Sequence, residues 1–128
     1  MSVIGIIGAM EEEVAALKEK MELEEVLKKA SMEFYKGTLQ GKEVVVVRSG
    51  IGKVNAGLCT QILADVFDAK MVINTGIAGS LDARIDIGDI VISTEALQHD
   101  MDATQFGYPL GQIPRMETLA FPADETMV

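Results

Sequence analysis

The amino-terminal stretch VIGIIGAMEEEVAAL, residues 3–17, constrains the fold more than any other part of the chain. Residues 3–7 are apolar, do not alternate with polar residues and are rich in β-branched side chains, which is typical of a strand buried on both faces. Val14, Leu17 and Met21 then recur at intervals of three and four, which predicts a helix. A buried strand that leads directly into a helix indicates an α/β fold, in which ligands bind at the carboxyl ends of the strands.

Composition and charge limit the classes of protein. The 128 residues, 48% hydrophobic and 24% charged, are typical of one globular domain. A formal charge of −9 argues against nucleic acid and against an anionic membrane surface as the main partner. Cys59 is the only cysteine, so we expect neither a disulfide framework nor a cysteine-based metal cluster. The first apolar run is too short for an anchor and follows no basic segment, so we expect no signal peptide and a cytoplasmic protein.

Four further segments predict strands. Residues 32–39 and 44–47 flank the turn-forming sequence Gln40–Gly41–Lys42, which predicts a β-hairpin. Residues 71–74 and 90–93 are apolar runs next to glycine-containing loops, and they predict two more strands.

Helical and irregular segments account for the remainder. A helix is predicted to run to about Phe67, and four apolar residues share one of its faces: Val54, Leu58, Ile62 and Val66. The charged residues 22–29 are compatible with a second short helix or with a surface loop. Residues 98–122 lack a clear period and contain all three prolines, so we expect a long irregular loop. The order of elements predicts a layered α/β fold, with a sheet that is cut short at residue 128.

Three short motifs resemble known binding motifs, but their spacing or composition excludes that interpretation. Gly5–Gly8 lacks the G-x-G-x-x-G spacing of a dinucleotide-binding turn. Gly52–Lys53 is followed by Val54 instead of Ser or Thr, and no glycine lies five residues before it, so it is not a P-loop. Residues 99–102 (HDMD) offer too few nitrogen or sulfur ligands for a structural zinc site, so we expect a loop without metal.

Three loops that contain glycine follow buried strands, at residues 8–10, 49–50 and 76–79. Glycine lets the backbone approach a ligand closely, so these loops could line one crevice. Ordinary turn formation explains the same glycines equally well.

Five motifs occur in the order GIIGAMEEE, SGIGKVNA, INTGIAGS, GDIVIS and HDMDATQFGYPLGQIP. In order and spacing they closely resemble the 5′-methylthioadenosine/S-adenosylhomocysteine nucleosidases, along essentially the whole chain but only about the amino-terminal half of a family member. The resemblance implies a nucleoside phosphorylase-like fold, a three-layer α/β/α sandwich around a central mixed sheet. Residues 1–128 would then be the amino-terminal part of a single nucleosidase domain.

The resemblance also implies an activity. Members of the family are homodimers that hydrolyse the N-glycosidic bond of methylthioadenosine or S-adenosylhomocysteine and release adenine, without a metal or an organic cofactor. The reaction serves methionine salvage and removes by-products of S-adenosylmethionine.

The resemblance assigns site residues by their place in the motifs. Glu13 would be the catalytic glutamate, which positions and deprotonates the attacking water, and Glu11 and Glu12 would be charges at a helix start. The substrate pocket would be lined by Met10, Ile51, Ile77, Ala78 and Gly79. Ile77 stands where many relatives have Ser or Thr, which puts a hydroxyl role there in doubt. A loop from the partner subunit would close the pocket with Ala103, Phe106, Tyr108 and Pro114.

The sequence also departs from the family. The later Met-Glu pair of the family, which binds the ribose hydroxyls, and its Ser-Asp pair, whose aspartate protonates the leaving adenine, have no counterpart in residues 98–128. We therefore expect little hydrolase activity from this chain alone. One alternative is a purine nucleoside phosphorylase of the same fold, with Arg48 and Lys53 near phosphate, although Glu13 would repel that anion. The other alternative is a non-catalytic oligomerising fragment.

Overall fold

The computed structural model describes residues 2–128, and the chain divides into two compact units between Gly79 and Ser80. The elements are β1 (Val3–Gly8), α1 (Glu11–Lys20), β2 (Glu22–Lys29), β3 (Met32–Leu39), β4 (Lys42–Arg48), α2 (Lys53–Phe67), β5 (Ala69–Asn74), β6 (Glu95–Ala96), the 3-10 helix η1 (Thr104–Phe106) and β7 (Phe121–Pro122). The first unit contains every element from β1 to β5. In the described part of the chain, no helix is long and apolar enough to cross a membrane.

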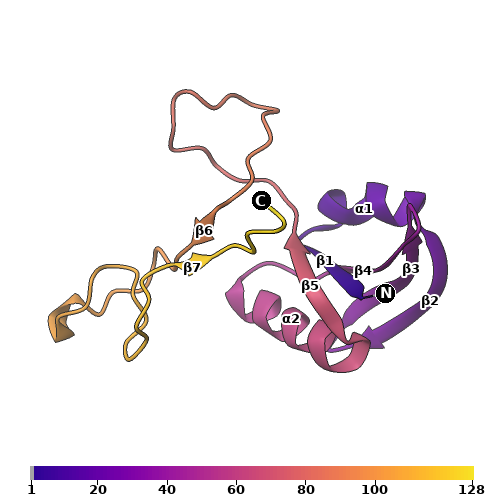
Figure 1. The fold of residues 1–128 in the computed structure, drawn as a ribbon, viewed down its shortest axis with the longest axis horizontal. Coiled ribbons are helices and arrows are strands. Elements are labelled where there is room, and N and C mark those ends of the chain that lie inside the picture. Colours follow the sequence, from indigo (N-terminus) through magenta and orange to yellow (C-terminus); the bar gives the residue numbers. More distant parts are fainter. Residues whose placement is uncertain (1) are drawn as a thin grey trace. The chain divides into compact units, whose positions relative to one another are not determined.

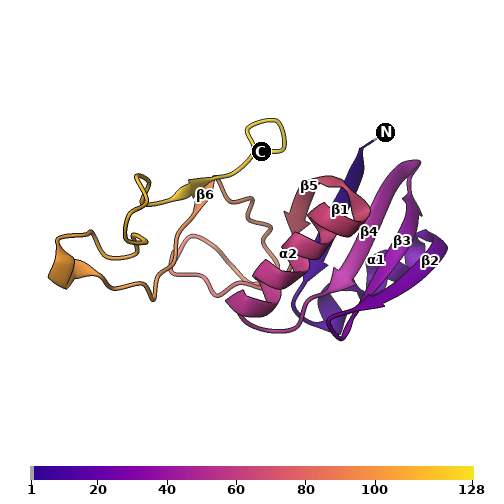
Figure 2. The same cartoon turned by 90° about the horizontal axis from the view of Figure 1, so that it is seen from below.

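The five strands of the first unit form one mixed sheet in the order β2-β3-β4-β1-β5. Strand β1 lies in the middle of its parallel part, between β4 and β5, whereas β2, β3 and β4 pair antiparallel. Figure 2 shows β2 and β5 at opposite edges of the sheet. The predicted central mixed sheet is therefore confirmed.

The four valines of β4 show how the layers form. Val45 and Val47 pack in a cluster with Cys59 and Leu63 of α2, while Val44 and Val46 pack in a second cluster with Val14 of α1. Because alternate side chains of a strand point to opposite faces, one uninterrupted apolar run serves both clusters. The two helices consequently cover opposite faces of the sheet (Figure 1), and the predicted three-layer arrangement is confirmed.

Two tight turns shape the antiparallel part of the sheet. Gln40 and Gly41 have φ values of 49° and 76°, and they join β3 to β4 in the predicted hairpin. Ala30 and Ser31 have φ values of 50° and 61° and join β2 to β3. Residues 22–29 are thus the strand β2, and both interpretations of this segment, helix or loop, were wrong. Its mostly exposed charged side chains conceal the strand pattern, which pairing with β3 imposes.

The helix α2 packs with a different face from the one that its apolar spacing indicated. Cys59 and Leu63 are fully buried. Of the four residues on the predicted face, Ile62 packs against the core, whereas Val54 is 86% exposed and Leu58 and Val66 are also exposed. The helix is apolar around much of its circumference, so periodicity alone did not identify the inner face. Gly5 of β1 helps to select that face, because a Cβ atom there would lie only 2.8 Å from Cδ1 of Leu63.

The second unit has little regular structure. Its two strands, β6 and β7, are two residues long and pair antiparallel. The predicted strand at residues 90–93 is wrong, since this segment forms none. Ile90, Val91 and Ile92 are exposed and have no paired neighbour among the described residues, and strand propensity has little effect without a partner. The predicted irregular character of residues 98–122 is confirmed, apart from η1 and the short strand β7.

Candidate active site

Three loops come together at the carboxyl ends of β1, β4 and β5. The N–H group of Ser49 donates to the carbonyl of Gly8 over 2.9 Å, and the N–H group of Thr75 donates to the carbonyl of Ile7 over 2.9 Å. These bonds continue the parallel pairing past the ends of β4 and β5. They place the loops after both strands beside the turn that leads from β1 into α1.

The carboxylate of Glu13 lies at this junction and accepts three backbone hydrogen bonds. Its Oε2 atom accepts from the N–H groups of Ala9 (2.7 Å) and Met10 (3.0 Å), and its Oε1 atom accepts from Ile77 (3.0 Å). Glu13 is the third residue of α1, so its bond from Met10 is the carboxylate half of a capping box. The bond from Ile77 comes from 64 residues further along the chain, and helix capping does not require it.

Two glycines provide the space that Glu13 occupies. A Cβ atom on Gly76 would lie 2.6 Å from Oε1 of Glu13, and one on Gly8 would lie 3.0 Å from the Cβ atom of Glu13. Sequence reasoning assigned these glycines to turns or to ligand approach and missed their contact with the glutamate. The signal that could have revealed it is a carboxylate in a first helical turn, next to strands that end in glycine.

The backbone donors determine the electrostatics of the site. They lower the pKa of Glu13 below its ordinary value, with the bond from Ile77 as the largest cause and the bonds from Met10 and Ala9 adding to it. Partial burial opposes them by raising the pKa. Because the N–H groups stabilise the charged form, the carboxylate is ionised at neutral pH.

The other glutamates of α1 have different surroundings. Glu11 is paired with Lys18 at 2.9 Å, and the same ammonium group lies 4.2 Å from the centre of the Tyr35 ring. Glu12 is exposed to solvent. Among these three acidic residues, only Glu13 contacts the loop after β5.

The remaining residues expected at the pocket in the first unit lie on the same loops. Ile51 is 74% exposed, and its carbonyl accepts a hydrogen bond from the Asn55 side chain over 2.8 Å. Ile77 is 82% exposed, and Ala78 and Gly79, which follow it, are exposed too. Met10 is half-buried in the turn before α1. The structure thus places all five expected pocket residues in the three strand-end loops.

The four residues expected to act on a partner subunit lie in the second unit. Ala103 is buried and precedes η1, whereas Phe106, at its end, is 81% exposed. The hydroxyl of Tyr108 accepts a hydrogen bond from the N–H group of Arg115 over 3.1 Å, and Pro114, next to Arg115, is exposed. The Tyr108 bond fastens the loop to itself and leaves Phe106 projecting.

A pocket of about 310 Å³ opens beside the end of β4 and is lined by Ala30, Ser31, Met32, Arg48, Ser49, Gly50 and Asn55. Neither Glu13 nor Ile77 lines it, so it is separate from the carboxylate. In the part of the chain that the structure describes, no group of three or more His, Cys, Asp or Glu residues could hold a metal ion.

Comparison with known proteins identifies the class to which this fold belongs. Residues 3–128 match the sequence profile of the family described as the phosphorylase superfamily. The chain therefore belongs to the phosphorylase superfamily, and the expected phosphorylase-like fold is confirmed.

Individual relatives are more specific. The chain is 54% identical over 125 residues to the 5′-methylthioadenosine/S-adenosylhomocysteine nucleosidase of Staphylococcus carnosus. The matched residues make up 98% of this chain and 54% of the relative. A nucleosidase of the same name from Colwellia psychrerythraea, in complex with adenine, superposes with a TM-score of 0.93 at 49% identity, over 97% of this chain and 51% of that one. The futalosine hydrolase of Helicobacter pylori gives a TM-score of 0.91 at 34% identity, over 98% of this chain and 54% of that one. The chain thus spans about half the length of the curated relatives that it matches.

Proposed function

We propose that residues 1–128 are the amino-terminal part of a nucleosidase domain that hydrolyses the N-glycosidic bond of 5′-methylthioadenosine and S-adenosylhomocysteine, with release of adenine. The observation that carries this proposal is the ionised carboxylate of Glu13, which backbone N–H groups from two strand ends hold in place. The sequence supports the proposal too, because the chain is 54% identical over 125 residues to a nucleosidase whose name states both substrates.

Glu13 would act on the water and on the charge of the transition state. Cleavage of an N-glycosidic bond passes through a state in which the ribose resembles an oxocarbenium ion, and a nearby carboxylate stabilises that positive charge. The same carboxylate accepts a hydrogen bond from the attacking water and finally takes its proton. Because the lowered pKa makes Glu13 a weak base, orientation of the water and stabilisation of charge would precede the proton transfer.

The substrate would be held mainly by apolar surface. Ile51 and Ile77 expose large apolar side chains on the loops after β4 and β5, which suits contact with the ribose and the alkylthio group. Met10 would complete this wall, and the backbone of Ala78 and Gly79 would border the purine. No described atom lies within 4 Å of the place of a Gly79 side chain, so a ligand could approach the backbone there.

A homodimer would complete the pocket. We propose that Ala103, Phe106, Tyr108 and Pro114 reach the alkylthio pocket of a partner subunit. The exposure of Phe106 supports this role, because a large aromatic side chain that its own unit leaves uncovered is suited to an interface. We further propose that the reaction takes place in the cytoplasm, as part of methionine salvage, and needs no cofactor.

The residues that the resemblance assigns to the ribose hydroxyls and to protonation of adenine are not among residues 1–128, so we expect little activity from these residues alone. The proposed function is therefore tested in a chimera, in which residues 1–128 replace the matching part of the Staphylococcus carnosus nucleosidase. We expect this chimera to release adenine from methylthioadenosine and S-adenosylhomocysteine without added phosphate. Glu13→Gln should lower kcat by about 10²–10⁴-fold, the usual range for loss of a general base.

Glu12→Gln is the matched control and should leave kcat unchanged, since Glu12 is exposed and does not contact the loop after β5. Full activity of the Glu13→Gln chimera would exclude the catalytic role. A reaction that requires phosphate would instead identify a phosphorylase, and cleavage of futalosine alone would identify a different hydrolase. Adenine release by residues 1–128 in isolation, lost on Glu13→Gln, would show that this part of the domain is sufficient.

A further inference from the structure

The loop after β4 presents Ile51 between two glycines. Ile51 is 74% exposed, and its neighbours Gly50 and Gly52 have φ values of 85° and 100°. Glycine adopts such conformations without strain, but it also loses more conformational freedom on ordering than any other residue. An apolar side chain between two such glycines therefore needs a restraint if it is to stand at one place in a substrate pocket.

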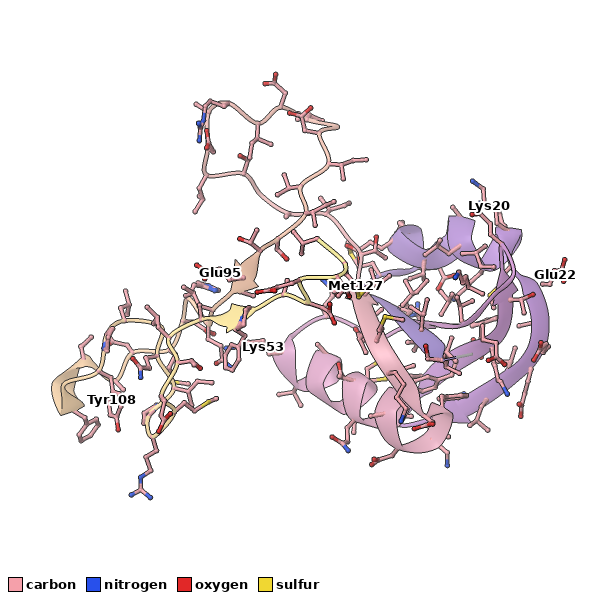
Figure 3. All side chains as sticks on the ribbon, in the orientation of Figure 1. Lys20, Glu22, Lys53, Glu95, Tyr108 and Met127 are labelled. Atoms are coloured by element: carbon pink, nitrogen blue, oxygen red, sulfur yellow. The ribbon has the colours of Figure 1, made fainter. Side chains whose placement is uncertain are left out.

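The side chain of Asn55 provides such a restraint. Its Nδ2 atom donates a hydrogen bond to the carbonyl of Ile51 over 2.8 Å. A Cβ atom on Gly50 would lie 3.0 Å from the same nitrogen, so the Asn55 amide group lies directly against the loop. Figure 3 labels Lys53, the first residue of α2, at the end of the helix that the loop enters, and Asn55 is the third residue of that helix.

The bond from Asn55 lies outside the regular bonding of the helix. The helix α2 begins after its cap residue Gly52, and the N–H group of Ala56 donates to the carbonyl of Gly52 over 3.1 Å as the first helical bond. The carbonyl of Ile51 lies one residue earlier, before the cap, where the helix itself provides no donor. The Asn55 side chain therefore extends the bonding of α2 into the loop.

Asn55 also connects the loop to the core of the first unit. Asn55, Cys59 and Leu63 are spaced four residues apart, so they lie along one face of α2. Cys59 and Leu63 are fully buried against the sheet, and Asn55 is half-buried at the end of this row. The packed face of the helix thus determines where the Asn55 amide stands, and the amide in turn determines where the Ile51 carbonyl stands.

We infer that Asn55 is a positioning residue for the substrate, because it holds Ile51 in the wall that contacts the ribose and the alkylthio group. Asn55 lines the pocket beside the end of β4, which neither Glu13 nor Ile77 lines, so it would act through Ile51 and not on the reacting atoms. The inference rests on the proposed function, since it takes Ile51 as part of the substrate pocket. A contact that is equal in the ground state and the transition state affects KM and leaves kcat unchanged.

The test uses the chimera of residues 1–128 with the Staphylococcus carnosus nucleosidase, and methylthioadenosine as the substrate. Asn55→Asp keeps the size of the side chain but replaces the donor with a carboxylate oxygen, which cannot donate. A carboxylate in the first turn of a helix is favourable, so this variant should not weaken α2. We expect KM to rise about three- to tenfold, as for the loss of one hydrogen bond, and kcat to change less than about twofold.

Two further variants separate the loop bond from other effects. Asn55→Ala removes the same bond without adding a charge, and it should raise KM to a similar extent. The hydroxyl of Thr60 also donates to a carbonyl four residues earlier, that of Ala56, over 2.8 Å. Thr60→Val removes this bond, which is exposed and lies within the helix, so KM and kcat should both stay unchanged.

A second measurement follows the loop itself and does not depend on turnover. In NMR relaxation, the order parameter of the Ile51 N–H bond should be about 0.85 in the original chimera and should fall below about 0.6 in Asn55→Asp. Thr60→Val should keep the original value. A purely structural role of Asn55 would lower the stability of the whole first unit, which urea unfolding of the same variants measures.

Three outcomes would overturn the inference: an order parameter of Ile51 that both Asn55 variants leave unchanged, a KM that rises no more in them than in Thr60→Val, or a fall in kcat at constant KM. If the original chimera releases no adenine, the proposed function fails. A lower order parameter in the Asn55 variants would then still support the hold of Asn55 on Ile51. Failure of the positioning role and failure of the proposed function are therefore distinguishable.

Discussion

The two units of the chain differ in how their apolar side chains are used. Among residues 2–128, every buried hydrophobic residue except Ala103 lies in the first unit, on the two faces of the five-stranded sheet. The second unit exposes many large ones, among them Leu81, Ile87 and Ile90. Its order rests on local turns, such as the bonds from Thr104 to Asp102 and from Thr126 to Asp124.

This difference indicates which part of the chain can hold a side chain at a fixed position. A carboxylate that must stand at a fixed position needs a packed scaffold, and Glu13 lies on the first unit, beside the fully buried Val14. Apolar residues that form an interface with another polypeptide are exposed in the unbound chain. The contrast between the units predicts that equivalent substitutions have unequal effects.

The largest effect is expected in the core. Phe34 is fully buried and stacks on Phe67, with ring centres 5.3 Å apart. Phe34→Ala should lower the free energy of unfolding by about 3–5 kcal/mol, because it removes a large apolar side chain and leaves a cavity. Urea unfolding followed by circular dichroism measures the change. A loss below about 1 kcal/mol would show that the first unit is less tightly packed than its burial indicates.

A smaller effect is expected where the backbone approaches Glu13. Gly76→Ala should cost about 1–3 kcal/mol, because its Cβ atom would overlap Oε1 of Glu13. Displacement of the carboxylate should also raise the pKa of Glu13 toward its ordinary value, which a carboxyl-detected NMR titration measures. Gly79→Ala is the matched control in the same loop, since its new methyl group meets no atom within 4 Å. Equal effects of the two substitutions would contradict the contact.

The effect of pH on the contribution of Glu13 to stability should be confined to acid solution. The pKa of Glu13 is lower in the folded chain than in the unfolded chain, so its contribution to stability is present above the ordinary value near 4.5. The contribution is lost as the pH falls through the lowered folded value, where the carboxylate takes up a proton. The difference in unfolding free energy between the original chain and Glu13→Gln should therefore shrink below pH 4.5. A difference that is constant with pH would show that the backbone bonds do not favour the charged form.

The smallest effect is expected in the second unit. Phe106→Ala is the chemical equivalent of Phe34→Ala, but Phe106 is largely exposed, so the free energy of unfolding should change by no more than about 0.5 kcal/mol. The same urea titration provides the measurement. A loss comparable to that of Phe34→Ala would mean that Phe106 is buried in solution, and the contrast between the units would fail.

Sequence reasoning predicted the parts of the fold that local pattern determines. The buried strand β1, the helices and the hairpin between β3 and β4 were predicted because apolar spacing and turn residues are local signals. Strand β2 was missed because its pairing partner, and not its charged sequence, makes it a strand. The strand predicted at residues 90–93 was wrong for the opposite reason. The segment is apolar, but among the described residues it has no neighbouring strand to pair with, so it does not form a strand.

For the candidate site, the motif singled out Glu13 and its neighbours, and the structure shows what holds the glutamate. Bonds from Ala9 and Met10 follow from the position of Glu13 in the first helical turn, so sequence could have predicted them. The bond from Ile77 could not be predicted in this way, because it depends on the arrangement of β1 and β5 in the sheet. The catalytic and pocket roles stay predictions until the chimera is assayed.

All three donors to Glu13 are main-chain amides, and this has a consequence for how such a protein can diverge. Side chains at positions 9, 10 and 77 can change size and polarity while their N–H groups remain, so the surroundings of the carboxylate can vary without releasing it. Proline alone would remove a donor, because it has no N–H group. The side chains at these three positions and the position of the Glu13 carboxylate can therefore evolve independently.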